Sequence, residues 1–295
     1  MHCLHKFHLE NIAMDFFYER ITYIFDRLHT SWEHERVHKR ISVLLVCLFV
    51  GSLVLIELNR RHNLPGPMAS MLPDNHFSAI GAAFTVILIL EVLGLIFALP
   101  CSFSRSMGKQ FELLSLILLR DAFKELSHFP EPLSFSGNEA AILKILSDGF
   151  GALVIFALLG VFYQLHEHTS EGAGQPGDLY RFVSAKKSIS LFLLTCFLLM
   201  GGQSIYLFLS GQGSIDFFHN FYTLLILTDI LVVLISQCFL PSFFSIFRNS
   251  GYALSTMFIR LALVAPPYYN VLMGMAAIIF AIFLTLVSNR LFPGK

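Results

Sequence analysis

Long apolar runs, separated by short polar or proline- and glycine-containing segments, dominate this chain. About 20 residues of apolar helix span the hydrocarbon core of a bilayer, and eight runs reach or approach that length. They predict helices over residues 41–58, 76–99, 107–126, 149–165, 188–209, 217–240, 251–264 and 270–289. The pattern therefore predicts an all-α polytopic integral membrane protein with eight transmembrane helices.

The segment before the first run has a different periodicity. Its apolar residues recur at spacings near 3.6, with acids and bases between them: Leu9, Ile12, Phe16, Phe17, Ile21, Ile24, Leu28 and Trp32. This pattern predicts an amphipathic helix over 7–36 that lies in the membrane interface or docks on a partner. Met14 is a second candidate start, so residues 1–13 can be an upstream extension. The segment precedes the first span without a cleavable signal pattern.

The order of features along the spans occurs twice. In each half an apolar helix with an internal acid ends at Leu-Pro, a Ser/Phe-rich turn follows, and the next helix carries an internal arginine. Four helices per half is an even number, so both copies enter from the same side and form a parallel repeat. The predicted organisation is an N-terminal segment (1–38), a first repeat (39–165), a Gly-rich cytoplasmic linker (166–185) and a second repeat (186–295).

The positions of basic residues predict the orientation. In an eight-span topology both termini lie on the same side of the membrane. Twelve basic residues are on that side: Arg27, Arg36, Lys39, Arg40, Arg105, Lys109, Arg181, Lys186, Lys187, Arg248, Arg290 and Lys295. The other side has four: Arg60, Arg61, Lys124 and Lys144. Cytoplasmic loops are enriched in Lys and Arg, so both termini are expected in the cytoplasm. We expect a plasma membrane, namely the inner membrane of a bacterium.

Composition agrees with this class. Hydrophobic residues make up 55% of the chain and charged residues 14%, and the formal net charge is zero. Soluble domains usually carry about 25% charged residues. The expected partners are the lipid bilayer and, through the N-terminal helix, a second copy or a membrane complex. Nothing in the charge suggests nucleic-acid binding.

Charged residues inside the apolar runs are the main candidates for function. Glu91 and Asp229 lie in the second helix of each half, and Arg120 and Arg260 in the third. Such charges cost about 2.5–3.5 kcal/mol each near the bilayer centre, so they usually pair or face a polar cavity. At about 1.5 Å per residue, each acid and arginine reach similar depths. We therefore predict the pairs Glu91–Arg120 and Asp229–Arg260.

Two interpretations of the pairs stay open at this point. They can hold helices together, or they can line a path in which the carboxylates bind a proton or cation. Asp121 is an alternative partner of Arg120, or it faces water with Lys124. Gln203 and Ser204, after two glycines in the fifth helix, are either packing residues or a polar patch on such a path.

Other patterns suggest no chemistry. His2, His5 and His8, and His34 and His38, have spacings that two ligands on one helix face would need, but they lie in polar, charged surroundings. The five cysteines form no CxxC pair, so neither a metal nor a disulfide framework is expected. HExxH, GxSxG and P-loop motifs are absent, so no enzyme activity and no cofactor is predicted. The leading hypothesis is a transporter or channel for a small ion, proton or solute. The alternative is a non-transporting scaffold or anchor subunit.

Overall fold

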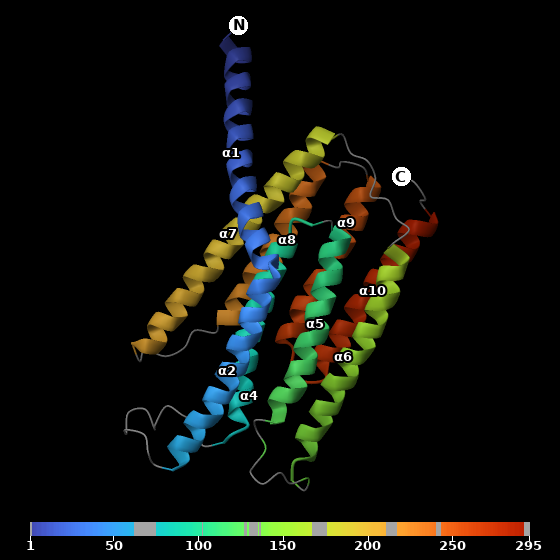
Figure 1. The fold of residues 1–295 in the computed structure, drawn as a ribbon. Helices are drawn as coiled ribbons and strands as arrows, with labels where there is room; N and C mark the ends of the chain where they lie inside the picture. The colour runs from blue at the N-terminus through green and yellow to red at the C-terminus, as the bar shows by residue number, and fades with distance from the viewer. Residues whose placement is uncertain are drawn as a thin grey trace.

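The computed structural model describes residues 2–61, 75–101, 103–126, 129, 135, 137–166, 176–210, 217–239 and 243–291. Within these ranges the chain is all-helical, as predicted, and contains no strand (Figure 1). Its helices are α1 (His2–Glu33), α2 (Glu35–Arg60), α4 (Ser78–Ala98), α5 (Phe103–Glu125), α6 (Glu139–His166), α7 (Pro176–Leu209), α8 (Phe217–Phe239), α9 (Phe243–Val264) and α10 (Tyr269–Leu291). The predicted start at Met1, the loop 63–74, the linker residues 167–175 and the turn at 240–241 lie outside the described residues.

Two helices begin well before the apolar runs that predicted them. Helix α6 begins at Glu139, inside the polar stretch 127–148, where the sequence allows a short helix capped by Asn138; that helix is continuous with the apolar run because no proline interrupts the chain after Asn138. Helix α7 begins at Pro176, inside the range taken as linker, so residues 176–185 are helical. Proline is favoured at the first position of a helix because its fixed φ suits that turn. Apolar runs therefore mark the membrane-crossing part of a helix and not its ends.

Six of the described helices are long and apolar enough to cross a bilayer: α2, α4, α6, α7, α8 and α10. These helices indicate a multi-pass membrane protein. Helices α5 and α9 have 23 and 22 residues but are too polar to qualify by composition. Polar residues of α9, including Asn249, Ser255 and Arg260, lie on its buried face. The predicted count of eight spans therefore depends on whether α5 and α9 cross inside a shell of apolar helices.

From α2 onward the helices alternate in direction (Figure 1), and within each half of the chain each helix packs on the next. In the first half α2 contacts α4, α4 contacts α5, and α5 contacts α6. In the second half α7 contacts α8, α8 contacts α9, and α9 contacts α10. The halves meet where α5 packs on α9 and α6 on α10. Helix α1 begins, and α10 ends, at the same end of the bundle, the upper end in Figure 1.

Small residues let the two halves approach closely. Ala277 and Ala281 of α10 are completely buried in the cluster formed by α5, α6, α9 and α10. A Cβ added to Gly151 of α6 would lie 2.4 Å from a methyl carbon of Val271 on α10. The packing of α6 on α10 therefore depends on the absence of a side chain at Gly151.

Helix α1 combines a docked part with a part that extends beyond the bundle (Figure 1). Phe25 is buried, and its ring and that of Trp32 pack on Phe97 of α4, with centroids 5.9 and 5.7 Å away. The carboxylate of Asp26 lies 2.6 Å from Nζ of Lys187 on α7. Trp32 therefore packs on the helix bundle. A helix that only lay in the membrane interface would not need this contact.

Candidate functional site

The first charge pair is closed. Glu91 on α4 and Arg120 on α5 face each other, and the two terminal nitrogens of Arg120 each donate to one carboxylate oxygen of Glu91. The two side chains are only 14% and 16% exposed. A two-pronged arginine–carboxylate contact satisfies both groups and fixes their geometry. This pair therefore ties α4 to α5.

The second charge pair is open. Asp229 on α8 and Arg260 on α9 lie together, but the shortest distance, from Nη2 of Arg260 to Oδ2 of Asp229, is 3.8 Å. That distance is too long for a hydrogen bond. Among the described residues, the buried Oδ2 of Asp229 and Nε of Arg260 have no hydrogen-bond partner. A polar contact of this length leaves room for water or another small polar species between the groups.

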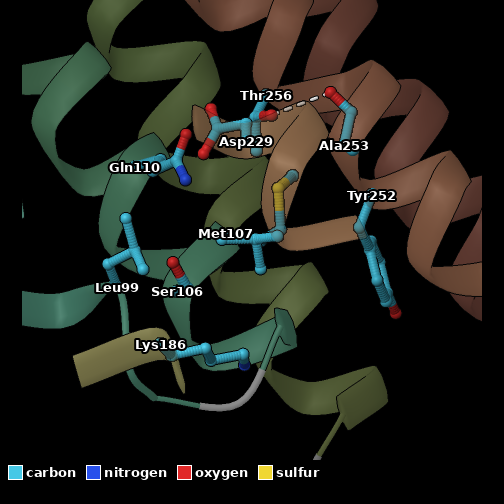
Figure 2. Close-up of a pocket in the computed structure, with 10 residues that line it drawn as sticks. Leu99, Ser106, Met107, Gln110, Lys186, Asp229, Tyr252, Ala253 and Thr256 are labelled. Atoms are coloured by element: carbon cyan, nitrogen blue, oxygen red, sulfur yellow. Dashed lines mark hydrogen bonds between the residues drawn. The ribbon is translucent and has the colours of Figure 1, made fainter. Parts of the chain in front are cut away.

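A cavity of about 30 Å³ adjoins the open pair (Figure 2). Helices of both halves line it with Leu99, Ser106, Met107, Gln110, Lys186, Asp229, Val232, Tyr252, Ala253 and Thr256. Gln110, on α5, is 4% exposed, and its side-chain oxygen has no hydrogen-bond partner among the described residues. A cavity of this size holds one or two waters when polar groups line it. Two acceptors without donors therefore face one small space between the halves.

A lysine also lines this cavity. Lys186 of α7 is 3% exposed, and its Nζ donates to the carbonyl oxygen of Cys101 over 2.9 Å. The same ammonium lies 4.6 Å from the centre of the Phe182 ring. Buried ammonium groups need such compensation because leaving water is costly.

The other predicted site residues lie apart from this cavity. Asp121 is exposed at the surface and lines a separate cavity of about 50 Å³ between α4 and α5, with Arg120 and Lys124. On α7, Gln203 is exposed and Ser204 half-buried, and neither lines the cavity beside Asp229. The structure therefore does not bring Gln203 and Ser204 to the charge pairs.

Residues that sequence reasoning missed complete the polar interior. Gln110 and Lys186 line the cavity, and buried Asp148 of α6 accepts a 2.9 Å hydrogen bond from Asn270 of α10. Tyr222, buried on α8, lies within electrostatic range of both Glu91 and Arg260. In the sequence Lys186 resembles its neighbour Lys187, so no local signal separates a buried lysine from a flanking one.

Metal ligation finds no support in the described part of the chain. No group of three or more His, Cys, Asp and Glu side chains there could hold a metal ion. His34 is exposed, and its ring accepts from the backbone of Arg36 at the start of α2. The side chains of His2, His5, His8 and His38 lie outside the described ones.

Comparison with protein-family models, curated proteins and solved structures gives no match for this chain.

Proposed function

We propose that this protein moves a proton or another small cation across a membrane, along a path between two parallel four-helix repeats. One observation carries the proposal: beside a cavity that both halves line, Asp229 presents a buried carboxylate oxygen that accepts no hydrogen bond from the described residues. Ionisable residues among membrane helices usually face such interior cavities and mark ion pathways. Asp229 is then the group that binds the ion.

The open geometry suits transient binding. Arg260 places a tethered positive charge 3.8 Å from the carboxylate of Asp229, and Lys186 places a second on the lining of the same cavity, so a bound cation competes with both. Conduction requires a site that attracts an ion and also releases it. In the Glu91–Arg120 pair, both carboxylate oxygens already accept hydrogen bonds from the arginine. Such a carboxylate has no free oxygen with which to bind an ion. We therefore assign a structural role to Glu91 in place of the carrier role that its position in the sequence suggested.

The repeat and the eight-span topology belong to this proposal. The same order of helix contacts in both halves supports a duplication, and the central position of α5 and α9 explains how polar helices can cross a bilayer. The helices packed on α9 then shield its buried Arg260 from lipid. Both termini are then cytoplasmic by the distribution of Lys and Arg, in a plasma (bacterial inner) membrane.

Flux through proteoliposomes tests the assignment. Purified protein with Asp229→Asn should lose proton and monovalent-cation flux to the level of empty liposomes. Asn keeps the shape of the side chain and removes its charge. The matched variant Glu91→Gln should retain flux, provided that it elutes as a folded species on size exclusion. Wild-type protein that moves neither protons nor Na⁺, K⁺ or ammonium would refute the proposal.

The extension of α1 favours a second candidate, a scaffold or anchor subunit. Tyr23, Ile24 and Leu28 are exposed on this helix, beside the buried Phe25. A partner helix or a membrane surface could cover them. Absence of flux, together with a specific complex that is lost on Tyr23→Ser and Ile24→Ser substitution, would support this candidate over transport.

A further inference from the structure

The position of Lys186 has no explanation in helix packing alone. Its carbon stem enters the bundle from α7, and its ammonium ends beside the turn that joins α4 to α5, where the Cys101 carbonyl accepts from it (Figure 2). The adjacent Lys187 points elsewhere and pairs with Asp26 on α1. One of two consecutive lysines is therefore inside the cavity and the other outside it.

The chemistry of the cavity matches an ammonium group. An ammonium has three donors, and the cavity contains two buried acceptors without donors, Oδ2 of Asp229 and Oε1 of Gln110. The lysine stem has four flexible carbons, so its head can exchange one acceptor on the cavity lining for another. The Cys101 carbonyl can accept from water when the ammonium leaves it.

We propose that Lys186 is an internal gate, a tethered cation that repels mobile cations from the Asp229 cavity at the end of the bundle where α4 meets α5. When the ammonium is bound to the Cys101 carbonyl, its positive charge keeps other cations out of that end of the cavity. When no ion occupies the site, the ammonium moves from this carbonyl to Asp229 and Gln110 and takes the place of the ion. This inference rests on the proposed function for the ion that it controls. Its electrostatic content can be tested without transport.

Thiol labelling inside the cavity provides the test. Ser106 lines the cavity, so Ser106→Cys is introduced into the full chain with the five native cysteines replaced by alanine. The Cys101 backbone carbonyl is retained in this background. The reaction rate is measured with 2-aminoethyl methanethiosulfonate, which is cationic, and with methyl methanethiosulfonate, which is neutral. The ratio of the two rates reports electrostatic access, because packing affects both reagents.

Neutral variants of Lys186 should raise the cationic-to-neutral rate ratio about tenfold, the factor that ~1.4 kcal/mol of repulsion produces. Lys186→Gln keeps a donor for the Cys101 carbonyl, and Lys186→Met is a second neutral variant if the first does not fold. Lys186→Arg should keep the wild-type ratio. Lys187→Gln is the matched control, since it removes a charge one residue away and outside the cavity.

Three results would overturn the gate. An equal rise with both reagents would mean that the substitution loosened packing. The same rise in Lys187→Gln would mean that surface charge controls access. An unchanged ratio in both neutral variants would mean that Lys186 does not repel cations. The proposed function fails separately, through the flux of Asp229→Asn, so a gate without transport and transport without a gate give different results.

Discussion

Each charge pair joins an acid on one helix to an arginine on the next, but the two pairs make different contacts. In the first half, Arg120 holds both oxygens of Glu91 in a two-pronged contact. In the second half, Arg260 stays 3.8 Å from Asp229, and buried polar atoms of both residues lack partners. A carboxylate and an arginine on consecutive helices therefore give one closed pair and one open pair.

The surroundings explain which pair is open. The cavity beside Arg120 of the closed pair is lined by α4 and α5 of one half, whereas the open pair borders a space that both halves line. Leaving a buried polar atom without a hydrogen bond destabilises a protein by about 1–3 kcal/mol. An arrangement with several such atoms in one small space is expected where the space is occupied during function. The comparison thus separates a pair that holds two helices together from a pair with hydrogen-bonding capacity left over, the feature on which the proposed ion binding rests.

Removal of the two arginines should give the largest difference between the pairs. Arg120→Met leaves Glu91 as an uncompensated charge among apolar helices, and breaking a buried pair in this way costs about 3–5 kcal/mol. Arg260→Met also leaves a carboxylate unpaired, but it should cost less, because the cavity beside Asp229 has room for a water that hydrates the carboxylate. Both values come from reversible unfolding in mixed micelles.

A double variant controls this comparison. Replacing Glu91 and Arg120 together by methionine should restore most of the stability, because no charge is left unpaired. If the two arginine variants lose equal stability, the distinction between a closed and an open pair is wrong.

Contact between the halves provides the next prediction. Gly151→Ala places a methyl group 2.4 Å from a γ carbon of Val271, a β-branched residue with little freedom to move. Overpacking of this kind costs about 1–3 kcal/mol. Gly160→Ala, on the same helix with open space around its Cβ position, is the matched control and should not destabilise. The same unfolding assay measures both variants.

Val271→Ala should rescue the stability of Gly151→Ala, since it removes the colliding methyl groups. Failure of this rescue would show that α6 and α10 do not meet as the fold requires. This result also supports the comparison of the two charge pairs, because it tests whether the two halves of the chain pack against each other as the structure shows.

Helix geometry explains why the sequence predicts the residues of the charge pairs. A charge inside an apolar run is conspicuous, and a rise of about 1.5 Å per residue converts sequence position into depth. The partners of Glu91 and Asp229 follow from matching depths on consecutive helices. The sequence does not predict that one pair forms hydrogen bonds and the other does not, because these contacts depend on neighbouring side chains from the other half of the chain.

Residues at the ends of apolar runs resist prediction for a related reason. Lys186 precedes a span, where lysine ordinarily faces the cytoplasm, and only the crossing of α7 over the α4–α5 turn buries it. Gln110 lies in a helix with many other polar residues, so its burial is not distinctive. Conversely, Gln203 and Ser204 stand out within an apolar run but do not line the cavity. Polarity along one helix therefore predicts that a group needs a partner, while tertiary packing decides which partner it obtains.

The smallest expected effect concerns Gln110, and it has opposite signs in two assays. Gln110→Met removes a buried acceptor that has no donor among the described residues and keeps the side-chain volume. Stability should stay constant or rise by about 1 kcal/mol, because an unmet hydrogen-bonding group is replaced by an apolar one. Ion flux in proteoliposomes should fall, since the site beside Asp229 loses one of its two free acceptors.

Gln203→Met on α7 is the matched control and should change neither stability nor flux beyond error. A loss of stability in Gln110→Met would instead mean that its amide holds the two halves together, and the open site would then reduce to Asp229 alone.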